Sequence, residues 1–418
     1  MTADDILAAS ASPAELERLY RADRQQFTAA FPAAWAREPS SVVLAVWHER
    51  LSPDVPTPDD PTTSDWRSLV IAIVLSLAAG TLVKLPAFFG IDDDWHYACF
   101  AVPIAVTALI AYFAVAHRRS TGLQGSCALA CLVCFLFLTS LPDRPHSDTI
   151  VLSLIHVPLV LWTVLGVAFC GSDWRSVRAR IEYLRYWGEV VVYSSLILLG
   201  GIVLTGLTIA LFSLIKVDLK KWYMSYVVVY GVVAAPIVAS YLYDAWHKRK
   251  AKFAPMLANL FAPLFLVTVV VYLVAMAVLR RSPFSERDFL ISLNGLLLLV
   301  LAMTILSVAE RRSFGHSGLL DATNISLIVV TLLVDTIALA AIVFRLSAMG
   351  ITPNRLAVFG TNLLVFAHLT ALLKFYVAQV RRRSDSGPME KWTARYIPLY
   401  SAWTAFVAFL FPLLFRLE

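Results

Sequence analysis

Charged residues are scarce in this chain of 418 residues: only 15% are Asp, Glu, Lys or Arg, whereas a soluble domain carries about 25%. Hydrophobic residues make up 59% of the sequence, and the mean hydropathy is +0.72. The apolar residues fall in long runs separated by short charged stretches. These features exclude a soluble globular protein, a disordered chain and a coiled coil, and they are typical of a multi-pass helical membrane protein.

The sequence has only five cysteines, and all of them lie within or at the ends of apolar runs. This placement excludes a disulfide-stapled secreted domain and predicts free thiols. Cys127, Cys131 and Cys134 share one helical face, as a metal or thiol-relay site would require. Because that segment holds no His or carboxylate, the pattern favours packing instead. We therefore expect no metal and no cofactor.

Catalytic signatures are also missing. The chain contains no phosphate-binding loop, no GxGxxG after a strand, no HExxH and no GxSxG, so the sequence favours a protein that is not an enzyme. The net charge is +6, but Lys and Arg stand beside apolar runs, where they orient the chain and meet anionic headgroups. We expect membrane lipids as partners and no nucleic acid. The sequence leaves the oligomeric state open.

Residues 1–51 predict a small acidic helical domain. Ser12 and Glu15 around Pro13 form a capping box that begins a helix. Apolar residues then recur at mostly helical spacing, at Leu16, Leu19, Tyr20, Phe27 and Phe31. A second helix follows from Ser40 or Ser41 to Leu51. This domain is either a structural cap or a docking site for a cytoplasmic protein partner. Residues 52–65 form a proline-rich linker, and residues 66–418 form the membrane bundle.

Eleven apolar segments are long enough to cross about 30 Å of hydrocarbon. They are 68–88, 97–116, 123–141, 149–170, 189–215, 226–246, 254–279, 288–309, 320–346, 353–378 and 396–415. Trp392 and Tyr396 belong to an expected interfacial belt at the segment ends. Gly200, Gly201 and Gly206 predict the close approach of a neighbouring helix. The fold class is therefore an all-α polytopic bundle of about eleven transmembrane helices.

The distribution of Lys and Arg predicts the orientation. One set of alternate loops holds most of them, which makes that set cytoplasmic. The N-terminal domain is then cytoplasmic and the C-terminus exterior, and the acidic start predicts no cleavable signal peptide. The stretch 174–185 predicts an amphipathic interfacial helix that meets anionic lipids.

Two polar residues stand inside neighbouring apolar segments. Asp335 lies in the middle of 320–346, where an ionised carboxylate must face protein or water, pair, or stay protonated. His368 lies in the middle of 353–378, at a similar distance from the hairpin, so the two could meet. They form either a proton or ion relay or a buried polar pair that fixes helix packing. Asn362 could join this network, as could Asn294, Asn324 and Lys374.

The hairpin between these segments has a structural explanation. Gly350 can end one helix in the left-handed conformation, Thr352 can cap the next, and Pro353 suits its first turn. Arg345 and Arg355 flank the turn on the exterior side. Their guanidinium groups either hold a lipid phosphate or carboxylate or reach toward the interface.

Parts of the chain resemble a bacterial multi-pass membrane family known as domain of unknown function 4153 (DUF4153). The resembling residues lie in 185–189, 206–212, 283–295 and 335–362, within a region of roughly 180–378. The most specific part is the turn Gly350-x-Thr352-Pro353-Asn354-Arg355. The resemblance implies an integral protein of the bacterial cytoplasmic (inner) membrane with no assigned activity. It adds weight to Asp335, Arg345, Asn354 and Arg355 as site residues, because these positions match its pattern.

Two hypotheses for function follow. In the first, the chain is a transporter or lipid-handling protein with a polar site in the segments 288–309, 320–346 and 353–378. Asp335 would bind the proton or ion, and Arg345 and Arg355 would bind an anion at the exterior mouth. In the second, it is a non-catalytic envelope scaffold or sensor, and residues 1–51 dock a cytoplasmic partner.

Overall fold

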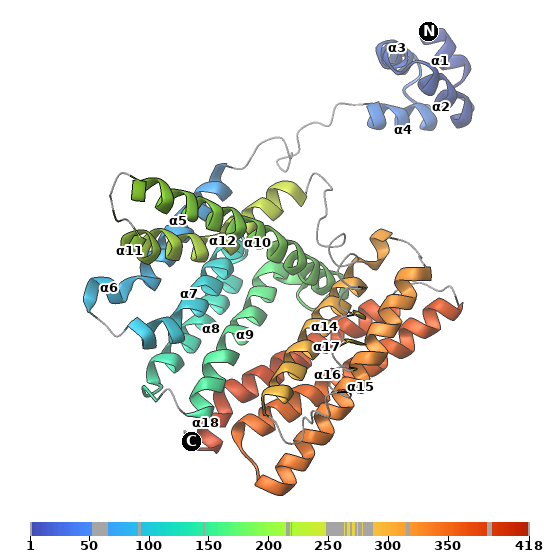
Figure 1. The fold of residues 1–418 in the computed structure, drawn as a ribbon. Helices are drawn as coiled ribbons and strands as arrows, with labels where there is room; N and C mark the ends of the chain where they lie inside the picture. The colour runs from blue at the N-terminus through green and yellow to red at the C-terminus, as the bar shows by residue number, and fades with distance from the viewer. Residues whose placement is uncertain are drawn as a thin grey trace. The chain divides into compact units, whose positions relative to one another are not determined.

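The fold is described from a computed structural model of the whole chain. The residues it describes are 2–51, 66–90, 93–144, 147–214, 218, 220–247, 287–314, 318–382 and 387–416, with isolated positions between 263 and 278. All secondary structure in these ranges is helical (Figure 1). The chain divides into two compact units, Met1–Ser64 and Asp65–Glu418. The predicted linker 52–65 lies outside the described residues.

The first unit contains four helices rather than the two expected. They are α1 (Ala3–Ala8), α2 (Pro13–Ala22), α3 (Arg24–Arg37) and α4 (Val42–Leu51). Pro13 begins α2, but the Ser12 side chain makes no capping hydrogen bond, so the predicted capping box is wrong. A capping box is found instead at α1, between Thr2 and Asp5. The helix expected to run on from Ser12 ends at Asp23, where extended backbone separates α2 from α3.

A small core holds the first unit together. Leu16 and Phe27 are fully buried, and Phe31 and Trp47 are nearly so. The apolar stripe predicted to face a partner therefore packs inside the unit itself. Burial of large aliphatic and aromatic side chains contributes about 1.5–3 kcal/mol each, which is how so small a unit forms a core of its own.

The second unit contains thirteen described α-helices, most of them longer than those of the first unit. They are α5 (Trp66–Val83), α6 (Leu85–Phe89), α7 (Asp93–Ala116), α8 (Thr121–Ser140), α9 (Asp148–Cys170), α10 (Val177–Leu214), α11 (Lys220–Tyr223), α12 (Val229–His247), α14 (Arg287–Phe314), α15 (Gly318–Met349), α16 (Pro353–Arg382), α17 (Gly387–Ala405) and α18 (Phe411–Leu414). A π-helical stretch, Met224–Val228, precedes α12, and another, Phe406–Leu410, joins α17 to α18.

Two apolar cores organise this unit. The larger one is formed by α5, α7, α8, α9, α10 and α12, and it contains the buried thiols of Cys127, Cys131 and Cys134. The smaller one is formed by α14, α15, α16 and α17. Helix α17 also packs against α9 and α10, so it connects the two groups of helices. The hydroxyl of Thr163 on α9 donates to that of Ser401 on α17 at 3.0 Å across this junction.

Nine helices in the described ranges are long and apolar enough to cross a membrane. They correspond to nine of the eleven predicted segments. Of the other two, 288–309 lies within α14, and most of 254–279 lies outside the described residues. The exact number of spans thus stays a prediction, while the helical, multi-pass membrane type of the protein is clear.

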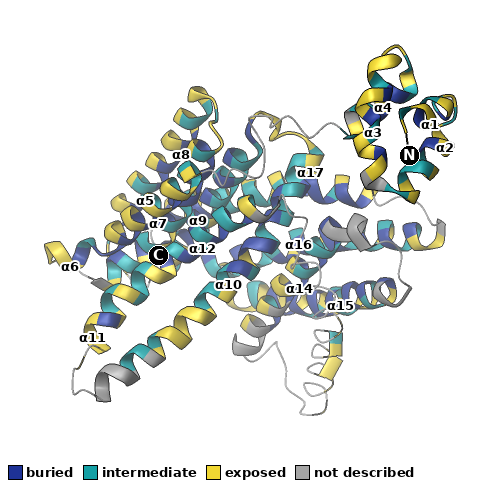
Figure 2. Cartoon of the chain, turned by 90° about the horizontal axis from the view of Figure 1, so that it is seen from above, coloured by how far each residue is buried: buried dark blue, intermediate teal, exposed yellow. Residues whose placement is uncertain are grey.

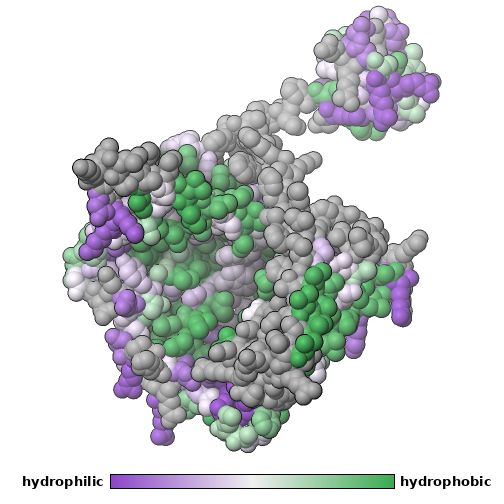
Figure 3. All heavy atoms as spheres, viewed as in Figure 1, coloured by the Kyte–Doolittle hydropathy of each residue, from purple (hydrophilic) through white to green (hydrophobic). Residues whose placement is uncertain are grey.

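The outer faces of these helices are strongly apolar. Figure 2 shows exposed residues along α5, α8 and α10, and Figure 3 shows apolar residues gathered over the second unit. Leu199 on α10, for example, is 59% exposed. Soluble proteins rarely expose such patches, so this surface suits hydrocarbon. Among the described residues, no atom lies within 4 Å of a Cβ added at Gly200, Gly201 or Gly206, so the predicted close approach is not seen there and stays a prediction.

The stretch 174–185, which was expected to lie in the membrane interface, runs directly into the span predicted at 189–215. Residues 177–214 form one helix, α10. Arg180 donates to the Ala394 carbonyl of α17 at 3.0 Å, and Arg185 donates to the Ala309 carbonyl of α14. These two arginines therefore hold helices together instead of meeting lipid.

Candidate functional site

Asp335 is the most unusual residue of the second unit. It lies on α15, its side chain is fully buried, and neither carboxylate oxygen has a hydrogen-bond partner among the described residues. Burying an ionised carboxylate without a partner costs several kcal/mol. Asp335 is buried because most residues of α15 are apolar and the helix packs against α14 and α16. Such a group either carries a proton or awaits a cation.

His368 lies on the neighbouring helix α16 and is 1% exposed. Its Nδ1 is 3.0 Å from the Tyr400 hydroxyl on α17, and its ring stacks on that of Tyr396 at 4.4 Å. Its Nε2 is buried and has no hydrogen-bond partner within the described ranges. Trp392 donates its indole N–H to the His368 carbonyl at 3.3 Å. Three aromatic residues of α17 therefore fix the position of this imidazole.

The structure does not join His368 directly to Asp335. In the part of the chain that is described, no hydrogen bond or ion pair connects them. The Tyr400 hydroxyl lies 3.0 Å from His368 Nδ1, and neither oxygen of Asp335 has a hydrogen-bond partner among the described residues. His368 on α16 is thus bonded to Tyr400 on α17, and the predicted polar pair of His368 with Asp335 is not among the described bonds.

The neighbouring asparagines have partners of their own. The Asn362 amide donates to Asn294 Oδ1 at 2.8 Å and connects α16 to α14. The Asn324 amide donates to Ser307 and to Tyr376, on α14 and α16. These bonds are of the kind that holds helices together in an apolar environment. Lys374 is exposed and has no place in this network.

The turn between α15 and α16 has the geometry that its sequence requires. Gly350 has a φ of +80°, which a residue with a side chain rarely adopts. The Thr352 hydroxyl accepts a hydrogen bond from the Arg355 backbone N–H at 3.4 Å, and Pro353 is the first residue of α16. The Arg355 guanidinium donates to the carbonyls of Met349 and Gly350 at 3.0 and 2.8 Å. Arg355 therefore caps the end of α15.

The two arginines are not brought to Asp335. Ten residues of helix, about 15 Å of rise, separate Asp335 from Arg345, which is half-buried near the end of α15. Arg355 lies beyond the turn. Asn354 is also half-buried there. A single site that contains the carboxylate and both guanidinium groups is therefore not formed.

Several residues of this site were not anticipated from the sequence. Trp392 and Tyr396 were expected in an interfacial belt, but Tyr396 is 7% exposed and Trp392 is half-buried, and both pack around His368. Trp392, Tyr396 and Tyr400 are four residues apart. This spacing places them on one helical face and is the signal that could have identified them.

A second polar cluster, also missed, lies between α7 and α12. The Asp244 carboxylate accepts a hydrogen bond from the Tyr112 hydroxyl at 2.8 Å and lies 2.9 Å from Nε2 of His117. On α10, Arg185 pairs with Glu182 at 3.0 Å. Every charged group named here has a close partner, so the cluster connects helices and leaves no open ligand position.

The described residues contain no group of three His, Cys, Asp or Glu that could hold a metal ion. Cys127, Cys131 and Cys134 face the larger apolar core and are surrounded by aliphatic and aromatic side chains.

Comparisons with known proteins give no family and no relative. No family model matches the chain, and neither a curated protein nor a solved structure is similar to it. The resemblance to DUF4153 therefore stays a prediction, and a function can be inferred only from the chain's own residues.

Proposed function

We propose that this protein is a membrane transporter in which Asp335 binds and releases a proton or a small cation during transport. The observation that carries the proposal is the burial of both Asp335 oxygens, without a partner among the described residues, in a helix long and apolar enough to span a membrane. Ionisable residues in such helices commonly mark ion or proton pathways.

The alternative role for a buried polar residue is to hold helices together. That role requires a partner, as Asn362 has in Asn294 and Asn324 has in Ser307. Asp335 has none in the described ranges, so it carries the cost of burial without the compensating bond. A residue that lowers stability in this way is typical of a functional site.

His368 and Tyr400 supply the rest of the proposed pathway. The Tyr400 hydroxyl can exchange a proton with His368 Nδ1, and the unpaired Nε2 of His368 offers a further acceptor or donor. Arg355 is not assigned an anion-binding role in this proposal, because its guanidinium caps α15. Asn362, Arg345 and Asn354 then support the helices and the turn around the pathway.

The test uses the full-length protein in proteoliposomes that enclose a pH-sensitive dye. Fractions of a bacterial metabolite extract are added outside, and internal acidification is recorded. We expect at least one fraction to give acidification that is lost in Asp335→Asn. Asp321→Asn is the matched control, because Asp321 lies on the same helix and has the Tyr376 hydroxyl as a partner at 3.5 Å. Transport that survives unchanged in Asp335→Asn refutes the proposal.

We also propose that the protein lies in the bacterial inner membrane with its N-terminus in the cytoplasm, because the loops richest in Lys and Arg then face the cytoplasm. Cysteines introduced at Ser120 and at Ser347, on opposite predicted sides, test this with a membrane-impermeant maleimide. Only the second should react in intact cells; the reverse pattern refutes the orientation.

A scaffold or sensor role is the second candidate. The original stripe is buried in the first unit's core, but Val42 and Val46 on α4 are 78% and 64% exposed and four residues apart, which leaves a small apolar face for a cytoplasmic protein. Deleting residues 1–60 distinguishes the candidates. A scaffold loses its phenotype, whereas the transporter keeps its Asp335-dependent transport.

A further inference from the structure

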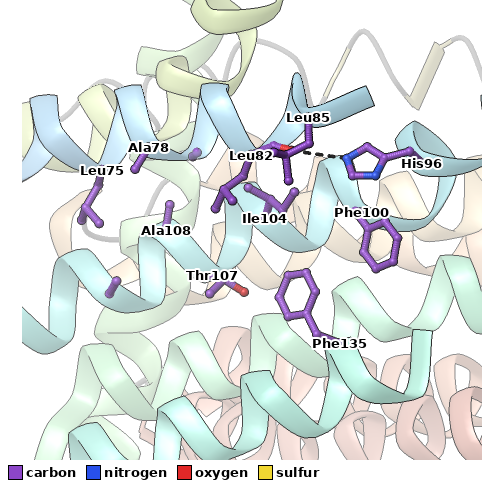
Figure 4. Close-up of a pocket in the computed structure, with 12 residues that line it drawn as sticks. Leu75, Ala78, Leu82, Leu85, His96, Phe100, Ile104, Thr107, Ala108 and Phe135 are labelled. Atoms are coloured by element: carbon purple, nitrogen blue, oxygen red, sulfur yellow. Dashed lines mark hydrogen bonds between the residues drawn. The ribbon is translucent and has the colours of Figure 1, made fainter. Parts of the chain in front are cut away.

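Two cavities of the second unit differ in the charge of their linings. The first, of about 470 Å³, lies between α5, α7 and α8, and Figure 4 shows side chains of α5 and α7 facing one another across it. Its described lining residues include no Asp, Glu, Lys or Arg, and only His96 and Thr107 are polar, so this lining does not identify a ligand. The second, of about 400 Å³, lies on α16 and has two cationic side chains in its lining.

The second cavity is a hollow on one face of α16. The described residues that line it are Leu373, Lys374, Val377, Ala378 and Arg381. Lys374 and Arg381 are seven residues apart, which is about two helical turns and about 10 Å of rise, so their side chains leave the same face of the helix. Val377 and Ala378 lie between them, and these short side chains leave room between the two long ones. A volume of about 400 Å³ holds about 13 water-sized groups, which is room for a phosphate and the glycerol attached to it.

Among the described residues, the face of α16 that carries this hollow is exposed along much of the helix. Residues 353–381 are long and apolar enough to span a membrane. Leu363 lies about three turns before Lys374 on the same face and is 50% exposed. Lys374 is also exposed, and it lies about 10 Å inside the end of the span at Arg381. An ammonium at that depth is costly in hydrocarbon, and a lipid phosphate beside it offsets the cost.

The two cations of this hollow differ from other cations of the second unit in their partners. Arg180 and Arg185 donate to carbonyls of other helices, and Arg355 donates to carbonyls at the end of α15. The ion pairs found between described residues involve neither Lys374 nor Arg381. A guanidinium can donate two parallel hydrogen bonds to a phosphate, and an ammonium adds a compact positive charge. The pair is therefore suited to a phosphate that comes from outside the chain.

We propose that Lys374 and Arg381 bind the phosphate of an anionic phospholipid in this hollow. The acyl chains then lie along the same face of α16, toward the exposed Leu363. A lipid fits better than a free phosphate because the cationic hollow continues into this apolar face. In the orientation proposed above, this end of α16 meets the cytoplasmic leaflet, where anionic lipids are found. The site does not depend on Asp335 or on the proposed transport.

The test uses the full-length protein in nanodiscs of phosphatidylcholine that contain a trace of a photoactivatable lipid, either phosphatidylglycerol or phosphatidylcholine, with the reactive group in the acyl chain. After illumination, labelled peptides are mapped by mass spectrometry. We expect phosphatidylglycerol to label residues 363–381 several-fold more than phosphatidylcholine does. The double variant Lys374→Gln/Arg381→Gln should remove this preference. The matched control is Lys391→Gln/Arg395→Gln, which removes the same charge from exposed positions on α17 outside the hollow and should keep the preference.

A variant that fills the hollow without changing its charge supplies a second test. Ala378→Trp should reduce the labelling of α16 by phosphatidylglycerol, whereas Val380→Trp, at a position that is 41% exposed and outside the lining, should leave it unchanged.

Three outcomes overturn the proposal. The first is equal labelling of α16 by the two lipids. The second is a preference that survives Lys374→Gln/Arg381→Gln, or that is lost equally in Lys391→Gln/Arg395→Gln, since the lipid would then not be held by this pair. The third is loss of the preference when inorganic phosphate is added to the buffer, which would assign the hollow to a free anion.

Discussion

Replacing Asp335 by leucine should stabilise the protein while abolishing its function. Leucine has the same branched arrangement of four side-chain heavy atoms as aspartate, and the position is fully buried in an apolar helix. The substitution removes two buried oxygens that have no hydrogen-bond partner among the described residues and replaces them with apolar surface. At a site that serves packing alone, the same change would break a bond and lower stability.

The expected gain is about 1–3 kcal/mol, the cost that protein mutations give for a buried polar group without a hydrogen bond. The matched control is Asn362→Leu on the adjacent helix. That change removes an amide bonded to Asn294 at 2.8 Å and leaves the Asn294 oxygen without its donor, so it should lower stability by about 1–3 kcal/mol. The two substitutions remove a similar number of polar atoms, yet their effects have opposite signs.

The assay is the thermal unfolding midpoint of each full-length variant, followed by intrinsic tryptophan fluorescence in the same detergent. We expect the midpoint order Asp335→Leu, wild type, Asn362→Leu, from highest to lowest. If Asp335→Leu unfolds as early as Asn362→Leu, then Asp335 has a structural partner, and the reasoning that treats it as a functional group is wrong.

Three further predictions concern other parts of the chain. Gly80→Ala should destabilise the protein by about 1–3 kcal/mol, because its new methyl overlaps the Tyr230 ring. Gly200→Ala, whose methyl meets open space, should stabilise it by about 0.5–1 kcal/mol. Equal unfolding midpoints for the two variants would contradict this. Arg355→Ala should lower stability by about 0.3–1 kcal/mol, because the variant loses the cap on α15. If the variant instead loses anion binding while its stability is unchanged, Arg355 binds an anion. Hydrogen bonds from two arginines lower the pKa of Glu17 below its ordinary 4.5, so its contribution to the first unit is present above that pH and is lost as the pH falls through the lowered value. In Glu17→Gln, the hydrogen-exchange protection of residues 2–51 should fall less than in wild type as the pH is lowered. The same fall in both proteins would refute this prediction.

The membrane character and most span positions could be predicted from the sequence because hydropathy is a local property of the chain. Nine predicted segments coincide with helices because about 20 apolar residues in a row have no other stable arrangement in hydrocarbon. For the stretch expected at the interface, 174–185, the partners of two arginines could not be predicted, for a tertiary reason. Arg180 and Arg185 find carbonyl partners on α17 and α14, which no local pattern shows.

The candidate site was predictable only in part. Asp335 and His368 were visible as polar residues in apolar segments, and the turn at Gly350 follows from its own sequence. The contribution of α17 was not predictable. Tyr400 reaches His368 across 32 residues of chain, and such pairing depends on how the helices pack. For the same reason, the sequence could not show that Arg355 caps α15.

The most direct test of the account is an infrared difference spectrum of the full-length protein in lipid, recorded between acidic and alkaline conditions. If Asp335 is a buried carboxyl that takes up and releases a proton, one carboxylic acid band, beside those of the other carboxyl groups, should be present in wild type and in Asp321→Asn and be missing from Asp335→Asn. Identical spectra from the Asp335→Asn and wild-type proteins would contradict the account.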